Sequence, residues 1–346
     1  MKKRMIVFVV LMMATLALVL AGCSGDKTSA TDKEDGSKGK KTVGWAMAYF
    51  DHPVYQTMMK ASKEVAEKEG IELVFADGKN DPVVQASLID NFIAQKVDAI
   101  IVTPTVADPL IPAIKKINEA GIPLLIVDRT MNTRGTGIKW DALVSWDMAK
   151  SGTLGAQQVA ESINKKGKVV VVEGTPGAGP TIERGNAFYE ELKKYPEVEV
   201  VYKVSADFNR TKGMEVTENI LQRYSKGEID AIYYMNDEMA LGGIQAIKSA
   251  GRLHDFKVIS VDGQKEAMDA VRAGEIDEET IFRPDEEAVA VSIAASIARG
   301  EKPDLANQSY NDQKFELTEF EGMPWVRPTC YKVDKSNLDA PEWQGW

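Results

Sequence analysis

Histidine and cysteine are scarce in this chain, which has two of each among 346 residues. A Ser-His-Asp or Cys-His catalytic set needs a histidine as its base, and a structural zinc site needs several clustered cysteine or histidine ligands. His52 and His254 are far apart in the sequence, as are Cys23 and Cys330. The composition therefore argues against both kinds of site.

Positive charge is also in deficit, with 42 Lys and Arg against 52 Asp and Glu and a formal net charge of −10. Nucleic-acid binding needs concentrated Lys and Arg, so no nucleic-acid partner is expected. The glycine-rich stretch 174–180 lacks both a Gly-Lys-Ser/Thr ending and Gly-x-Gly-x-x-Gly spacing. We interpret it as a tight strand-to-helix turn at a cleft, and we expect no cofactor.

The one long apolar run lies at the N-terminus. Three cationic residues precede an apolar stretch that ends in Leu20-Ala21-Gly22-Cys23. The stretch is shorter than the ~20 residues that cross a bilayer, so residues 1–22 are predicted to be a secretory signal peptide. The last four residues resemble a bacterial lipobox, which implies lipidation of Cys23 and a membrane anchor. Cys330 would then be a lone thiol, most simply a small buried residue.

The segment that follows is polar. Residues 23–41 are rich in Ser, Gly, Asp, Thr and Lys, and are predicted to form a flexible tether. The remaining ~300 residues can form two domains of ~150 residues each. We therefore expect an extracytoplasmic protein held at the membrane by lipid.

Short β-rich apolar runs alternate with amphipathic segments throughout these residues, a pattern typical of parallel strands joined by helices. Strands are predicted at 42–47, 71–76, 99–103, 124–127, 168–173, 198–204, 231–235 and 258–261. Helices are predicted at 54–68, 83–96, 109–120, 149–164, 181–194, 212–224, 238–250 and 266–273. Two successive blocks of this rhythm predict an α/β fold of two similar lobes.

Polar residues follow the predicted strands. They include Asp51-His52, Thr103, Asp128-Arg129, Asn236-Asp237 and Asp262. Ligands of open parallel sheets bind beyond the carboxyl ends of the strands, which makes this set a candidate site. For Asp237, a helix N-cap is the more ordinary role.

Several motifs in this order resemble one family. They are Asp128-Arg129, Ile182-Glu183-Arg184-Gly185, the stretch 206–213, Asn236-Asp237-Glu238-Met239-Ala240-Leu241-Gly242 and Val261-Asp262-Gly263. The series is similar to the ribose- and galactose-type sugar-binding proteins of ABC importers. The resemblance implies a type I periplasmic binding protein fold, with two Rossmann-like lobes joined by three crossover hinges. We expect one lobe at 42–145 plus about 283–316, and the other at 146–282 plus a C-terminal segment.

The resemblance also implies roles for individual residues. The implied hydroxyl-binding residues are Asp128, Arg129, Arg184, Asn236 and Asp262, with Phe208 and Tyr55 as aromatic partners of the sugar ring. Carboxylates and amides accept hydrogen bonds, while a guanidinium donates several at once. Core packing is the ordinary alternative for the two aromatic residues.

Three positions depart from the ribose-type pattern. His52 stands where asparagine is common, Val54 where an aromatic is common, and Arg283 where glutamine is common. Trp146 is a candidate for the missing ring, or for hinge packing. Arg283 leaves two ligands open: a neutral sugar, which we favour, or a sugar acid.

The sequence therefore predicts a monomeric binding protein that delivers a monosaccharide to an ABC permease, and not an enzyme. A sugar receptor for a sensor kinase or chemoreceptor would use the same residues. A retaining glycosidase would need two carboxylates ~5 Å apart, which sequence alone does not place.

Overall fold

The computed structural model describes residues 39–311, 313–338 and 345–346. The predicted signal peptide, Cys23 and most of the predicted tether lie outside these residues. None of the helices in the described ranges combines the length and apolar character needed to cross a membrane.

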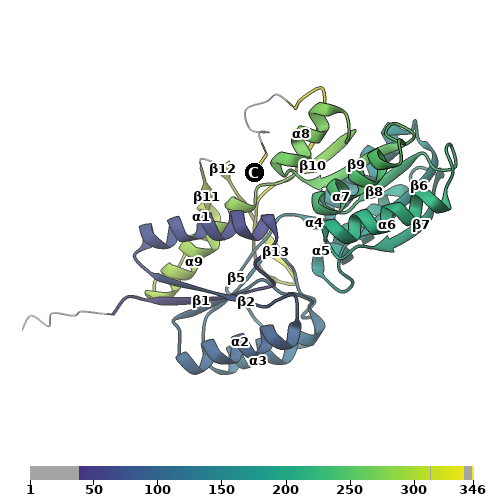
Figure 1. Cartoon of the computed structure of the whole chain (residues 1–346). Helices are drawn as coiled ribbons and strands as arrows, with labels where there is room; N and C mark the ends of the chain where they lie inside the picture. The colour runs from purple at the N-terminus through teal and green to yellow at the C-terminus, as the bar shows by residue number, and fades with distance from the viewer. Residues whose placement is uncertain (1–38, 312, 339–344) are drawn as a thin grey trace, which may run out of the picture. The chain divides into compact units, whose positions relative to one another are not determined.

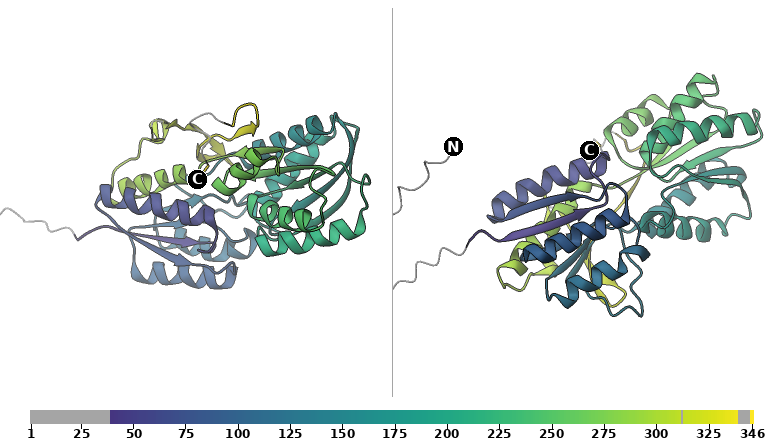
Figure 2. Two further views of the ribbon diagram at one scale, coloured as in Figure 1. Left: turned by 45° about the horizontal axis from the view of Figure 1, so that its top comes forward. Right: turned by 60° about the horizontal axis from the view of Figure 1, so that its bottom comes forward.

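The first lobe is built on a seven-stranded sheet in the order β13-β14-β5-β4-β3-β1-β2. Its parallel strands are β1 (Thr42–Met47), β2 (Glu72–Asp77), β3 (Ala99–Val102), β4 (Leu124–Val127), β5 (Ala142–Val144) and β14 (Met323–Arg327). The edge strand β13 (Glu316–Phe320) is antiparallel to β14. Helices α1 (Pro53–Glu69) and α9 (Val289–Ala298) pack together on one face, and α2 (Pro82–Gln95) and α3 (Ile111–Glu119) cover the other (Figure 1; Figure 2).

The second lobe is built on a six-stranded sheet in the order β15-β10-β9-β8-β6-β7. Its strands are β6 (Lys166–Glu173), β7 (Glu197–Ser205), β8 (Ala231–Tyr234), β9 (Lys257–Asp262), β10 (Glu278–Ile281) and the antiparallel β15 (Tyr331–Asp334). Its helices are α4 (Met148–Ser162), α5 (Gly179–Leu192), α6 (Arg210–Arg223), α7 (Asp237–Ser249) and α8 (Lys265–Ala273). Helix α4 packs on α5, and α6 on α7. The predicted α/β fold with two parallel-dominated sheets is confirmed.

Both sheets share one strand order. The first runs β2-β1-β3-β4-β5 and the second β7-β6-β8-β9-β10, so each lobe has its switch point between its first and third strands. Side chains that follow β1 and β4 in one lobe, and β6, β8 and β9 in the other, therefore lie at equivalent sheet edges.

Local sequence fixes several helix ends. The Asp81 carboxylate accepts hydrogen bonds from the backbone N–H groups of Val83 and Val84 at the start of α2. Asn209 caps α6 in the same way through Lys212. Helix α1 ends at Gly70, whose φ of 68° is the left-handed conformation that glycine adopts without strain. These caps satisfy N–H and C=O groups that a helix end leaves unpaired.

Within the part of the chain that the structure describes, the backbone passes between the two sheets three times: after β5, after β10 and after β14. The returning segment contains the short helices η2 (Pro284–Ala288) and η3 (Leu305–Asn307) and the hairpin of β11 (Ser309–Tyr310) and β12 (Gln313–Lys314). It supplies strands to the first sheet as far as Arg327, beyond the limit near residue 316 expected from the sequence. The chain then adds β15 to the second sheet.

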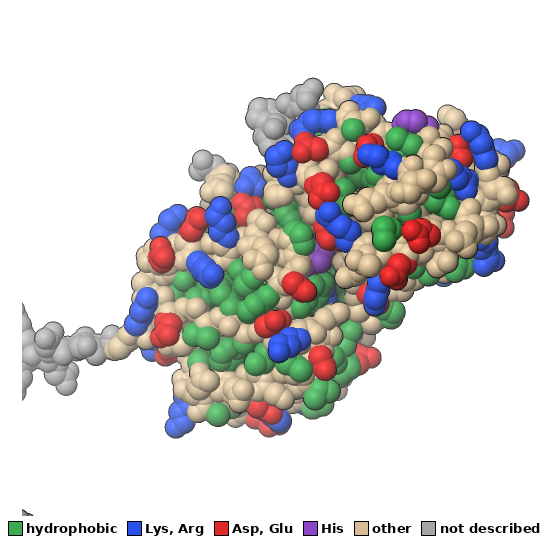
Figure 3. Space-filling model, in the orientation of Figure 1, with side chains coloured by type: hydrophobic (Ala, Val, Ile, Leu, Met, Phe, Trp, Pro, Cys, Tyr) green, Lys and Arg blue, Asp and Glu red, His purple; other side chains and the backbone are tan. Residues whose placement is uncertain are grey.

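Charges of both signs are interspersed on the face shown in Figure 3. Many surface charges of the described residues form ion pairs, for example Lys116 with Asp90 and Lys248 with Glu275. Exposed pairs of this kind contribute about 0–1 kcal/mol each. The surface charge therefore says little about stability, and the buried charges described next are more informative.

Candidate functional site

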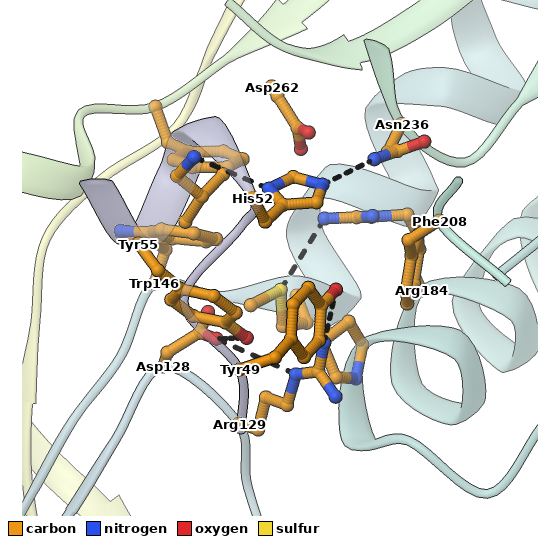
Figure 4. Close-up of a pocket in the computed structure, with 14 residues that line it drawn as sticks. Tyr49, His52, Tyr55, Asp128, Arg129, Trp146, Arg184, Phe208, Asn236 and Asp262 are labelled. Carbon is orange, nitrogen blue, oxygen red and sulfur yellow. Dashed lines mark hydrogen bonds and ion pairs between the residues drawn. The ribbon is translucent and has the colours of Figure 1, made fainter. Parts of the chain in front are cut away.

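One pocket is lined by both lobes at the carboxyl ends of their strands (Figure 4). The first lobe contributes residues that follow β1 and β4, and the second contributes residues that follow β6, β7, β8 and β9. Residues that follow β5 and β10, where the chain passes between the sheets, complete the lining. The lining residues are Tyr49, His52, Val54, Tyr55, Asp128, Arg129, Trp146, Met148, Pro180, Arg184, Phe208, Asn236, Asp262 and Phe282. The set combines aromatic rings with two guanidinium and two carboxyl groups.

Asp128 is held by its own lobe. It is 4% exposed, follows β4 and has a φ of 67°. The Tyr55 hydroxyl donates to its carboxylate at 2.9 Å, and the Arg129 guanidinium lies 3.7 Å away. The Ser145 hydroxyl donates to the Asp128 carbonyl at 2.7 Å. Burial raises the pKa of Asp128, and the charge of Arg129 and the bond from Tyr55 oppose that rise.

Arg129 is 3% exposed and lies among aromatic rings. Its guanidinium carbon is 5.5 Å from the ring centre of Tyr49, 5.8 Å from that of Tyr55 and 5.9 Å from that of Phe208 in the other lobe. It donates to the Thr105 carbonyl at 2.8 Å, while its Nε has no hydrogen-bond partner among the described residues. A buried donor without a partner costs free energy, so this Nε–H favours a ligand oxygen.

Arg184 comes from α5 in the second lobe and is 2% exposed. Its Nε donates to the Ser151 hydroxyl at 3.0 Å and its Nη1 to the Met235 carbonyl. The remaining nitrogen, Nη2, is 3.5 Å from the Met148 sulfur, which is a weak acceptor. The side chain is thus fixed while keeping donor capacity toward the pocket.

Asp262 is the second pocket carboxylate, at the end of β9, and is 4% exposed. No side chain of the described residues donates a hydrogen bond to it, and no dashed line reaches it in Figure 4. Burial and the nearby Asp237 raise the pKa of Asp262 well above its ordinary value, while Arg184 opposes the rise. A carboxyl group so placed needs donors from a ligand.

Asp237 lies behind this carboxylate and is not the helix cap expected from the sequence. The side chain that caps α7 is Asn236, which accepts from the Met239 N–H at 3.0 Å. Asp237 instead accepts from the N–H groups of Gly263 at 2.9 Å and Gln264 at 2.8 Å. It therefore fixes the loop that carries Asp262.

His52 and Asn236 meet across the two lobes, with His52 Nε2 3.3 Å from Asn236 Nδ2. His52 Nδ1 accepts from the Val54 N–H at 3.3 Å, so the hydrogen of the neutral ring is on Nε2. Burial and then Arg129 lower the pKa of His52 to about 3, which keeps the ring neutral at pH 7. The backbone of Phe208 also forms a hydrogen bond with His52, so the neutral ring links the two lobes at the pocket wall.

Phe208 is seated by an unusual backbone. Asp207 and Phe208 both have left-handed φ angles, 54° and 56°, which are rare for a bulky residue. Gly174 makes room for the ring, because a Cβ at that position would overlap it. The glycine-rich stretch 174–180 connects β6 to α5 beside the pocket. Its last residue, Pro180, is one of the residues that line the pocket. Strain held in this way is common at binding sites.

A second contact between the lobes lies near the pocket. The Thr130 hydroxyl donates to the Glu183 carboxyl group on α5. Gly179 permits this approach, because a Cβ there would be 2.8 Å from the Thr130 carbonyl oxygen. Burial and the charges of Asp147 and Glu321 raise the pKa of Glu183 to about 7, and Arg184 opposes that rise.

The structure brings most of the predicted site residues together. His52, Tyr55, Asp128, Arg129, Arg184, Phe208, Asn236 and Asp262 line the pocket. Trp146, the candidate for the missing ring, also lines it and stacks on Phe282. Their contacts with a ligand remain predictions.

Two predicted site residues lie elsewhere. Thr103 is fully buried, and its hydroxyl accepts from the Trp45 indole at 3.0 Å. Arg283 pairs with Asp285 at 2.6 Å and has a side chain 40% exposed. It follows β10 on the far side of Phe282 and lines a separate hollow with Tyr310 and Trp346. It is therefore not among the residues that line the pocket.

Four lining residues were not predicted as site residues: Tyr49, Met148, Pro180 and Phe282. Tyr49 lies two residues beyond β1, next to the predicted Asp51-His52 pair, so the strand-end rule could have found it. Met148 begins α4 directly after the first crossover. Nothing in the local sequence distinguishes it from a core methionine.

The comparisons with known proteins agree with this geometry. A model of the periplasmic binding protein domain matches residues 43–302. The ribose import binding protein of Bacillus subtilis is 35% identical over 260 residues, which are 75% of this chain and 82% of that protein. The galactofuranose-binding protein of Escherichia coli is 32% identical, over 68% of this chain and 74% of that protein.

Solved structures show the same arrangement. A solute-binding protein of an ABC transporter from Bacillus halodurans, with bound myo-inositol, has a TM-score of 0.77 and 29% identity, covering 89% of this chain and 99% of that one. The family resemblance predicted from the sequence is thereby confirmed. The chain belongs to the periplasmic binding protein family, with the two-lobed type I fold.

Proposed function

We propose that this protein binds a neutral monosaccharide or a related polyol in the pocket and delivers it to an ABC importer. The observation that carries the proposal is the composition of the pocket: two guanidinium groups, two carboxyl groups and one amide converge from both lobes among aromatic rings. A sugar presents hydroxyls at its edge and apolar C–H groups on its faces, and these groups complement such a lining.

The charge balance favours a neutral ligand. Arg129 and Arg184 carry two positive charges, and Asp128 and Asp262 supply two matching carboxyl groups. Arg283, which had suggested a sugar acid, is paired with Asp285 outside the pocket. A ligand carboxylate would therefore add an uncompensated charge to a buried site.

Binding would favour closure of the lobes. A ligand that touches Asp128 in one lobe and Asp262 in the other stabilises the arrangement in which both reach it. The three chain passages, near Ser145, Phe282 and Pro328, are the proposed hinges, because no other described segment runs from one sheet to the other. The closed form would be the one that a permease recognises.

Delivery to a permease implies a location outside the cytoplasm, and the N-terminal sequence supplies the proposed anchor. A lipid on Cys23 followed by a polar tether would keep a monomer near its permease without entering the pocket. Mass spectrometry of the mature N-terminus and fractionation of Cys23→Ala test this part. An unmodified Cys23 in a freely soluble wild-type protein would refute the anchor.

A thermal-shift panel tests the binding function. The chain without its first 23 residues is heated alone and with pentoses, hexoses, polyols and sugar acids. A ligand at about 100 times its dissociation constant adds about 2.7 kcal/mol to the free energy of unfolding, which raises the melting temperature clearly. A panel without any shift, from protein shown to be free of copurified ligand, would refute the proposal.

A further inference from the structure

Trp346 packs against the loop that carries Asp262, although 84 residues separate the two in sequence. Its indole Nε1 donates to the Asp262 carbonyl at 3.1 Å, and its backbone N–H donates to the Gly263 carbonyl at 3.2 Å. Its own carbonyl accepts from the Lys265 N–H at 3.0 Å. Three hydrogen bonds from one residue thus span the loop between β9 and α8.

These bonds supply hydrogen-bond partners that the loop and the start of α8 do not find in their own side chains. Helix α8 begins at Lys265 without a side-chain cap, so the Trp346 carbonyl satisfies one of its unpaired N–H groups. The loop backbone has two positive φ angles, 145° at Asp262 and 91° at Gly263, and the first is rare for a residue other than glycine. Asp237 holds it from inside the lobe, and Trp346 holds it from outside.

The same contact reaches the second passage between the lobes. The Asp262 carbonyl accepts from the Phe282 N–H at 3.1 Å as well as from the Trp346 indole. The rings of Phe282 and Trp346 are 6.3 Å apart, and Phe282 stacks on Trp146 in the pocket wall. One carbonyl therefore joins the binding loop, a proposed hinge and Trp346.

Gly345 is fitted to this contact. Its φ is 77°, and a Cβ there would be 2.7 Å from Lys265 Cα and 2.9 Å from Lys265 N. A side chain at residue 345 would push the backbone off the loop. The close approach of the backbone is thus a specific property of the Gly345-Trp346 pair.

We propose that Trp346 is a positioning residue for ligand binding: it holds the Asp262 loop so that the carboxylate faces the pocket. Trp346 does not line the pocket, so it acts through Asp262. The proposal rests on the binding function proposed above. It differs from a general stabilising role because it predicts an effect on affinity that depends on Asp262.

A double-mutant cycle tests this dependence with the full chain in detergent. Titration calorimetry uses whichever of ribose, xylitol and myo-inositol binds the wild type most tightly. Trp346→Phe removes only the indole donor and should weaken binding about three- to tenfold, and Trp346→Ala should weaken it more. In the Asp262→Asn background, Trp346→Phe should cost less than about twofold, because the positioned carboxylate is gone.

Trp140→Phe is the matched control. Trp140 is buried in the first lobe, and its indole N–H has no partner among the described residues. It should bind like the wild type. Affinity unchanged within about twofold in Trp346→Ala, an equal loss in the Asp262→Asn background, or an equal loss in Trp140→Phe would each overturn the proposal.

Hydrogen exchange separates this proposal from the binding function. In protein without ligand, Trp346→Ala should speed exchange of the amides at residues 263–266, while peptides from the first lobe exchange as in the wild type. If the wild type binds none of the three probes, the result contradicts the proposed binding function. The exchange measurement then still tests whether Trp346 holds the Asp262 loop. Unchanged exchange at 263–266 would overturn it.

Discussion

The two lobes place an aspartate at equivalent points, and the two differ in how they are held. Asp128 follows β4 and Asp262 ends β9, the fourth strand of each shared order, and both are 4% exposed. Asp128 has Tyr55 and Arg129 as partners from its own lobe. Asp262 has no side-chain donor among the described residues, and its pKa is raised well above its ordinary value.

This difference between Asp128 and Asp262 gives the two halves of the pocket different roles. The first-lobe half of the pocket is held within its own lobe, because the Asp128 carboxylate accepts from the Tyr55 hydroxyl and is paired with the Arg129 guanidinium. The second-lobe half carries a buried carboxyl group without a side-chain donor among the described residues, and its burial is costly until a ligand supplies further donors. Affinity and stability should therefore respond differently to substitutions in the two lobes.

Asp128→Asn should have the largest effect, and mainly on stability. It would leave Arg129 buried without its carboxylate, a loss that costs about 3 kcal/mol or more in comparable pairs. The free energy of unfolding of the ligand-free protein, from denaturant titration, should fall accordingly, and affinity should fall with it. A ligand-free stability equal to that of the wild type would show that the first-lobe half is not organised by this pair.

Asp262→Asn should give the opposite pattern. Affinity should fall by about 1.5–3 kcal/mol, or roughly 10- to 150-fold, through loss of charged hydrogen bonds to hydroxyls. The pKa of Asp262 is raised in the folded protein, so its ionisation costs stability above the ordinary value of 3.8. The variant should thus melt at the same or a higher temperature at pH 7. A lower melting temperature with unchanged affinity would remove the contrast between the lobes.

The contact between the lobes should respond to pH. Glu183 has a pKa of about 7 where it meets Thr130, against an ordinary 4.5 when solvated in separated lobes. Closure then takes up a proton between these values, so affinity should rise about tenfold as pH falls from 8 to 6. Titration calorimetry in buffers of different ionisation enthalpy measures how many protons are taken up on ligand binding.

Glu183→Gln should remove this part of the pH dependence. Glu190→Gln, on the same helix but exposed and paired with Lys193, should retain it. The neighbours Asp147, Glu321 and Arg184 are unchanged in both variants, so their contribution cancels. Identical pH profiles for wild type and Glu183→Gln would show that this contact does not form on binding.

Arg283→Gln should have the smallest effect. Arg283 is paired with Asp285 and half-exposed, so affinity for neutral sugars should change less than about twofold. Paired titrations with an aldose and its uronic acid measure this. A loss of tenfold or more would place Arg283 at the ligand and revive the sugar acid.

The sequence predicted the parts of the fold that have strong periodicity. The strands β1 and β4 were predicted to the residue, and helices α1 to α8 to within about two residues at each end. Helix α9 was not predicted. The short strands β5 and β10 were not, because three or four residues carry too little pattern. The strands β13 to β15 were missed because their pairing depends on distant partners.

The site shows the same limit. Residues directly after strands, such as Asp128 and Asn236, could be predicted because parallel strands end at one edge. Thr103 obeys the same rule, yet Trp45 takes its hydroxyl. Arg283 fits the family's linear order, but no sequence pattern tells on which side of Phe282 its side chain will lie. Asp285, two residues away in the sequence, binds the Arg283 guanidinium in place of a ligand.

The third passage of the chain has a consequence for folding order. Strand β14 pairs with β5, and the Trp325 indole donates to the Ser145 carbonyl across 180 residues of sequence. Pairings over such separations close late and slow folding. Until residues 323–327 have been made, β5 is an open sheet edge that invites wrong partners. The first lobe thus begins the chain but can be completed only near its other end.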